Sequence, residues 1–111
     1  MRKFTVKPKT ITASTNIDTQ SLERDIWAAL EKYMKKKMKG DDSWKEYTVV
    51  EVGPWEENPE MIQAEIRSEL LVNYKSQTEI DEVLDEVVAK YDPDAYFEPW
   101  SAGISQAYLR Q

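Results

Sequence analysis

The chain lacks cysteine and histidine altogether, and only three of its 111 residues are glycine. The absence of cysteine excludes disulfides, cysteine-ligated zinc and thiol catalysis. The absence of histidine removes the commonest general base. With so few glycines there is no glycine-rich phosphate loop, and no GxSxG motif occurs. We therefore expect a protein that is not an enzyme and that holds no metal ion and no cofactor.

Long apolar runs are also missing. No stretch approaches the roughly 20 apolar residues of a membrane helix. The basic N-terminal residues are not followed by the apolar core of a secretory signal. We expect a cytoplasmic protein that has no membrane partner, and a length of 111 residues fits a single domain over residues 1–111.

Charge is present in abundance, and the two signs are separated along the chain. Residues 1–40 hold ten Lys and Arg against four Asp and Glu, a net charge of +6. Residues 41–111 hold five against seventeen, a net charge of −12, which gives the total of −6. An acidic total disfavours non-specific binding to nucleic acid. These two oppositely charged parts of the chain, which we call its poles, either neutralise each other inside the molecule or bind a charged partner.

Two stretches have the periodicity of amphipathic helices. Residues 20–39 carry apolar side chains at helical spacing, with Asp18 or Thr19 as the predicted N-cap and Gly40 just beyond the end. Residues 77–91 repeat apolar side chains at the same spacing.

The predicted start of the second helix is a capping box. It is formed by Ser76 with Glu79, and Thr78 is the alternative cap.

Alternation and β-branched residues predict strands at 3–13, 44–52, 60–73, 95–100 and 103–110. The stretch 60–73 also suits a strand that runs into a helix. The resulting order, β-α-β-β-α-β followed by a short C-terminal strand, is that of the ferredoxin-like split β-α-β arrangement. We expect an α+β domain in which two helices cover one face of an antiparallel sheet.

A run of lysines ends the first predicted helix. Positive charge there complements the helix dipole, so a solvated helix end is the simpler interpretation and contact with phosphate or an anionic partner is the alternative. The members of this basic patch are Lys32, Lys35, Lys36, Lys37 and Lys39.

The second predicted helix has an acidic face, and aromatic residues lie in turns near strand ends. The carboxylates are either solvated or steer a basic partner, while the aromatic side chains either cover the core or anchor a partner. The partner-binding residues predicted from these features are Trp55, Glu79, Glu82, Asp85, Glu86, Tyr96, Phe97 and Trp100.

We expect from these features a small acidic, non-catalytic protein-interaction or regulatory module that binds a basic partner protein through the acidic helix and the aromatic anchors. One alternative is an acidic inhibitor of viral or mobile-element type that mimics nucleic acid and occupies a nucleic-acid-binding protein. Another is a self-associating ferredoxin-like domain, such as a homodimer, with a structural or small-ligand-binding role. Direct binding to nucleic acid is not expected.

Overall fold

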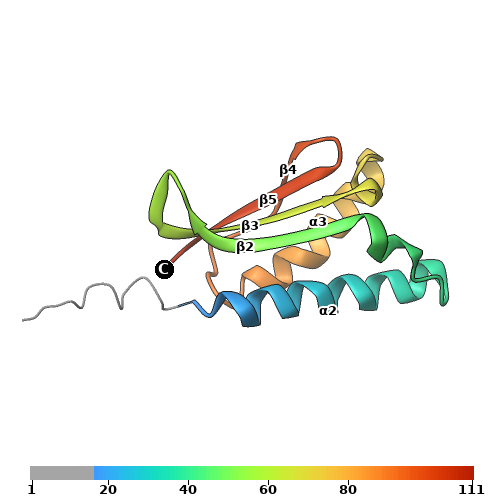
Figure 1. Ribbon diagram of the computed structural model, residues 1–111, viewed down its shortest axis with the longest axis horizontal. Coiled ribbons are helices and arrows are strands. Elements are labelled where there is room, and N and C mark those ends of the chain that lie inside the picture. The colour runs from blue at the N-terminus through green and yellow to red at the C-terminus, as the bar shows by residue number, and fades with distance from the viewer. Residues whose placement is uncertain (1–16) are drawn as a thin grey trace, which may run out of the picture.

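The computed structural model describes residues 17–111, so the predicted strand at 3–13 lies outside the described residues. Within this range the chain forms two helices and a four-stranded antiparallel sheet, and both helices lie on the same side of the sheet (Figure 1). The elements are α2 (Thr19–Met38), the 3-10 turn η1 (Ser43–Tyr47), β2 (Thr48–Trp55), β3 (Asn58–Ser68), the 3-10 turn η2 (Glu69–Leu71), α3 (Tyr74–Val88), β4 (Glu98–Ser101) and β5 (Ile104–Arg110).

The strand order in the sheet is β2-β3-β5-β4. Because β3 and β4 are each antiparallel to β5, they run parallel to each other, and α3 connects them across β5. A split β-α-β unit is therefore present, with the C-terminal strand in its centre. We predicted that this strand would be an addition to the sheet, whereas it occupies an interior position. The α+β class with two helices on one face is confirmed, but the ferredoxin-like order is not.

Helix α2 begins and ends close to the predicted limits. The Asp18 side chain accepts hydrogen bonds from the backbone N–H groups of Gln20 and Ser21, at 3.0 and 3.2 Å, which satisfies donors that a helix start leaves free. These bonds hold the pKa of the Asp18 carboxyl below its usual range. At the other end, Lys39 and Gly40 both adopt positive φ angles, of 40° and 99°, so the chain reverses one residue earlier than the glycine alone predicted.

Helix α3 begins three residues before the predicted start. Its N-cap is Asn73, which accepts hydrogen bonds from the N–H groups of Lys75 and Ser76 at 3.0 and 3.2 Å. The capping box of Ser76 with Glu79 was therefore wrong, and so was the alternative cap at Thr78. Asn73 fulfils the same requirement one helical turn earlier, because its short side chain reaches the first free N–H groups.

The strands at 44–52 and 60–73 were predicted at nearly the right places, but each contains a 3-10 turn. Trp44 lies in η1 rather than in a strand, and its ring is buried in the core. The second strand ends at Ser68, where η2 begins. The connection between these two strands is short, since β2 extends to Trp55 and β3 begins at Asn58.

The core lies between the helices and one face of the sheet. The alternation of β3 turns Ile62, Ala64 and Ile66 toward the helices, and opposite them β5 contributes Ala107 and Leu109. The helices supply the other half of this layer through Leu22, Ile26, Leu30, Ile80, Leu84 and Val88. The second face of the sheet has no described helix over it, and this asymmetry positions the candidate site.

Candidate functional site: the helix-free face of the sheet

The outward positions of the sheet combine carboxylates with aromatic and amide side chains. On β3 they include Gln63, Glu65 and Arg67, which are paired with Tyr108, Gln106 and Ile104 of β5. On the edge strands Glu51 stands opposite Glu65, and Glu98 stands opposite Gln106. We name this surface, formed by the outward side chains of β2, β3, β5 and β4, the open face.

Hydrogen bonds fix the polar side chains at the centre of the open face. The Tyr108 hydroxyl donates to Gln106 Oε1 at 2.7 Å, and Gln106 Nε2 donates to Glu65 Oε1 at 2.7 Å. Arg67 continues the network, with its guanidinium 2.7 Å from the Glu65 carboxylate and 3.1 Å from that of Glu51. A surface held in this way loses little side-chain entropy when a partner covers it.

One end of the open face contains an aromatic pair beside a depression. The Trp55 ring lies 4.6 Å from that of Tyr108, measured between centroids. Next to this pair, Gly53 has no side chain and leaves a shallow depression of about 230 Å³ with Glu51, Glu56 and Glu65 among its lining residues. Its shape and charge are suited to the aliphatic stem and the cationic end of a lysine or arginine side chain.

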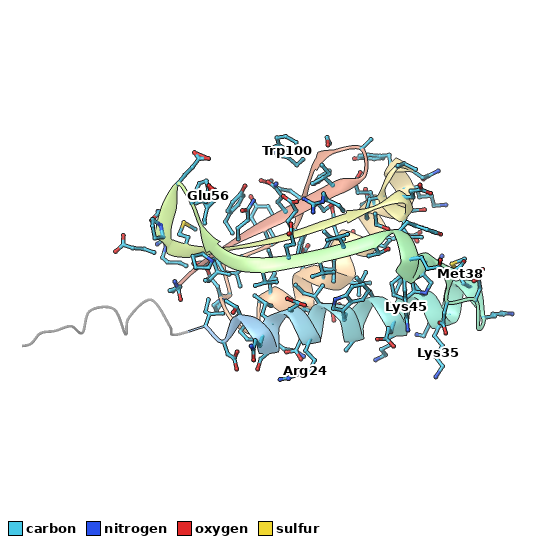
Figure 2. All side chains as sticks on the ribbon, viewed as in Figure 1. Arg24, Lys35, Met38, Lys45, Glu56 and Trp100 are labelled. Atoms are coloured by element: carbon cyan, nitrogen blue, oxygen red, sulfur yellow. The ribbon has the colours of Figure 1, made fainter. Side chains whose placement is uncertain are left out.

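The other end of the open face carries exposed apolar side chains. Trp100 is 68% exposed, and Figure 2 shows it on the side of the sheet away from α2. It lines a second shallow depression together with the exposed side chains of Val72 and Tyr74. Large exposed apolar side chains that lie together are typical of interaction surfaces.

The acidic residues predicted on the second helix do not form one free surface. Glu79 accepts a hydrogen bond from the Tyr33 hydroxyl and lies 3.4 Å from Lys37. These two contacts, the tyrosine bond first, lower the pKa of the Glu79 carboxyl. Asp85 accepts a hydrogen bond from the backbone N–H of Phe97 at 2.6 Å and so fixes the loop that follows α3.

Only Glu82 and Glu86 of the predicted carboxylates are exposed on α3. They lie on the helix side opposite its buried residues, so they face away from the sheet. The helix acids and Trp100 therefore do not share one surface.

The two neighbouring aromatic residues in the predicted site have different environments. Phe97 is only 3% exposed and belongs to the core, so its assignment as an exposed anchor was wrong. Tyr96 is exposed, as expected from the alternation of residues next to a strand.

The basic patch remains largely free of internal ion pairs. Lys37 contacts Glu79, whereas within residues 17–111 no carboxylate lies within 4 Å of the ammonium groups of Lys32, Lys35, Lys36 and Lys39. Among the described residues, the patch thus meets the acidic part of the chain through one ion pair, and its lysines are exposed.

A buried polar cluster that the sequence analysis missed lies between α3 and β5. Gln77 Nε2 donates to the backbone oxygens of Ser101 and Ile104, while Ser105 Oγ donates to Asp81 Oδ2 at 3.1 Å. The other oxygen of Asp81 has no hydrogen-bond partner among the described residues, and burial raises the pKa of this carboxyl to about 6. The burial of Asp81 could have been inferred from helical spacing, because this residue lies three positions before the buried Leu84.

Nothing in the described residues points to a metal centre or a membrane span. No group of three or more acidic side chains within 17–111 is placed to hold a metal ion. No helix in that range is both long enough and apolar enough to cross a membrane. Comparison with known proteins gave no match to a family model, to a curated protein or to a solved structure.

Proposed function

We propose that this protein is a non-catalytic protein-interaction module that binds a basic partner protein through the open face. The observation that carries the proposal is the juxtaposition on one helix-free sheet surface of exposed Trp100, the Trp55–Tyr108 pair and the carboxylates of Glu51 and Glu98. Aromatic side chains supply most of the affinity at protein interfaces, and charge steers the partner to them.

The position of this surface differs from the one we expected from the sequence. The acidic face of α3 is reduced to Glu82 and Glu86, because Glu79 and Asp85 are engaged in internal contacts. The open face keeps its carboxylates close to the aromatic side chains, so both groups can contact one partner. Its hydrogen-bonded centre also presents a preorganised surface.

We further propose that the fold is a ferredoxin-like arrangement in which the first strand has moved to the C-terminus. The support is the strand order, because β5 lies between β3 and β4, in the interior position that the ferredoxin-like order gives to its first strand.

The experiment is partner capture with matched charge-reversal variants. Tagged protein is incubated with cell lysate at low and at high salt, and captured proteins are identified by mass spectrometry. We expect Trp100→Ala and Glu98→Lys to lose a partner that the unmodified protein retains at low salt. The control variants Glu82→Lys and Glu86→Lys make the same change of charge on the exposed side of α3, and they should retain the partner.

Two results would contradict the proposal. If the Glu82 and Glu86 variants lost the partner while the Trp100 and Glu98 variants kept it, the binding surface would be α3. If no variant changed a salt-sensitive partner, the open face would have no part in binding. Circular dichroism of each variant establishes that the fold is retained.

A further inference from the structure

The outward side of α2 forms a basic surface opposite the open face. The helix buries Leu22, Ile26 and Leu30, and its other side presents exposed cations, one in the first half of the helix and the others from residue 32 onward. These cations are Arg24, Lys32, Lys35, Lys36 and Lys39. We name this surface the basic face.

Within residues 17–111 the basic face is only partly neutralised. The exposed Glu31 lies 3.5 Å from Lys45 of the following turn, and Asp25 and Glu86 line a shallow depression together with Lys32 and Lys36. Arg24 contacts the Ser21 hydroxyl at 3.0 Å, and no described carboxylate forms an ion pair with it. These cations are therefore available to an acidic surface of another molecule.

The acidic and basic surfaces lie on opposite sides of the fold. Figure 2 shows Arg24 and Lys35 pointing away from the sheet, while Glu56 and Trp100 lie beyond the sheet on the other side. One molecule cannot bring these surfaces together, but two molecules stacked in the same orientation can.

We propose that the open face of one copy binds the basic face of α2 of a second copy, head to tail. The inference rests on the proposed function, because it uses the same open face and names a second copy of this chain as a basic partner. Ala28 lies at the centre of the basic face and allows close approach of the helix to the sheet. Trp100 on the opposing copy offers an apolar contact beside the charged ones.

The dimensions of the two surfaces agree. From Arg24 to Lys39 the helix rises about 22 Å, at about 1.5 Å per residue. The eight residues of β2 extend over about 26 Å, at about 3.3 Å per residue. A helix laid along the strands therefore fits the length of the open face, with its lysines toward one end.

The contact is heterologous, so it does not close into a symmetric dimer. Each copy that binds through its open face leaves its own basic face free, and a chain of copies grows with concentration. The net charge of −6 opposes this growth over long distances. We expect association that is weak, concentration-dependent and lost when salt screens the facing charges.

The test uses two charge-reversal variants of the full chain and their mixture. The first, Lys32→Glu with Lys35→Glu, reverses the basic face and leaves the open face intact. The second, Glu56→Lys with Glu98→Lys, reverses one carboxylate in the turn between β2 and β3, at the end of the open face, and one on β4, both exposed and outside the hydrogen-bonded centre. Mass is followed by sedimentation velocity and light scattering at low salt.

The unmodified chain is expected to gain mass with concentration, and each variant alone should associate at least about tenfold more weakly, since attraction is replaced by repulsion. The mixture should associate and gain mass with concentration, because the two unmodified surfaces attract each other and so do the two reversed ones. A chain that carries all four reversals should associate again, since both surfaces have exchanged sign.

A monomeric unmodified chain at low salt would overturn the inference, as would variants whose association equals that of the unmodified chain. Association that increases with salt would point to an apolar contact and would also refute it. If self-association fails while captured protein is still lost on Glu98→Lys and kept on Lys32→Glu with Lys35→Glu, the proposed function stands without this inference. If the basic-face variant alone loses a captured nucleic acid, the occupant of α2 is a polyanion and not a second copy.

Discussion

Replacement of Asp81 by asparagine is expected to stabilise the protein at neutral pH. The Asp81 side chain is almost fully buried between α3 and β5, and one of its oxygens lacks a partner among the described residues. Its pKa rises from 3.8 to about 6: burial raises it most, the Ser105 hydrogen bond opposes the rise, and the nearby Asp85 charge adds to it. The ionised form is therefore less stable in the folded protein than in the unfolded chain.

The magnitude follows from the difference between the two pKa values. One pKa unit corresponds to 1.36 kcal/mol, so a rise from 3.8 to about 6 costs about 3 kcal/mol once Asp81 is ionised in both states. Because the pKa of Asp81 is higher in the folded protein than in the unfolded chain, the cost depends on pH. Below pH 4 the carboxyl is protonated in both the folded and the unfolded state, and the cost is absent. The cost grows between pH 4 and 6 and is complete above pH 6.

An asparagine keeps the size of the side chain and can still accept the hydrogen bond from Ser105, but it carries no charge. Because the asparagine amide brings two N–H donors to the place where the carboxylate had one unpartnered oxygen, the net gain at pH 7 is about 2 kcal/mol, below the full ionisation cost. The assay is urea unfolding followed by tryptophan fluorescence from pH 4 to 7.5, with Glu82→Gln as the matched control on the exposed side of α3.

The difference in free energy of unfolding between Asp81→Asn and the unmodified chain should shrink toward zero near pH 4. A difference that stays constant over the whole range would show that Asp81 does not titrate between pH 4 and 6. A loss of stability at pH 7 would show that the ionised carboxylate is favoured in the fold. Either result would refute the reasoning from burial.

Three further perturbations test separate contacts. Burial and the hydrogen bonds to Glu79 and Asp25 raise the pKa values of Tyr33 and Tyr91 to about 12, so an ultraviolet titration should show two of the six tyrosines ionising late. Removal of the α3 cap by Asn73→Ala should cost about 1 kcal/mol in urea unfolding, and equal loss in a Ser76→Ala control would favour the sequence-predicted cap instead. Gly103→Ala should lower the unfolding free energy by about 1 kcal/mol, because Gly103 has a φ of 89° that disfavours a Cβ, and an unchanged midpoint would contradict this.

The helices could be predicted from the sequence because their apolar spacing is nearly free of exceptions. Leu22, Ile26 and Leu30 repeat every four residues, and α2 buries all three. The start of α3 was missed because Asn73 and Ser76 are both favourable caps, and only the tertiary position of the first turn distinguishes them. The local sequence therefore predicts the type of a secondary-structure element more reliably than its first and last residues.

The strand order could not be predicted in the same way. The alternation of 104–110 predicted a strand, but it carries no information on which neighbour that strand pairs with. Pairing depends on contacts such as Ile62 with Leu109 and Ala64 with Ala107, which join residues more than forty positions apart. The buried state of Phe97 has a similar origin, since its backbone N–H is fixed by Asp85 on the preceding helix.

The candidate site was half predicted, because Trp55 and Trp100 were recognised as aromatic residues in or near turns. The residues around them, such as Glu51, Glu65 and Tyr108, come from three strands, and only the register of the sheet brings their side chains together. The acidic face of the second helix was predicted as part of the binding surface because its carboxylates lie close together in the sequence. Two of them, Glu79 and Asp85, serve internal contacts that no local pattern predicts.

The separation of charge along the sequence becomes a separation between layers of the fold. Among the described residues the basic stretch is largely α2, whose cations face away from the sheet, while the outward side of the sheet carries Glu51, Glu65 and Glu98 together with Arg67, which pairs with the first two. Like charges on one surface repel one another, and a surface adapted to stability and solubility alone intersperses the two signs. Internal pairing among residues 17–111 accounts for only part of the pattern, since Lys37 pairs with Glu79 while Lys32, Lys35, Lys36 and Lys39 have no carboxylate partner there. Our proposal is that complementarity to a charged partner accounts for the rest, and the charge reversals at Glu98 and Lys35 test whether that partner is another protein or a second copy of this one.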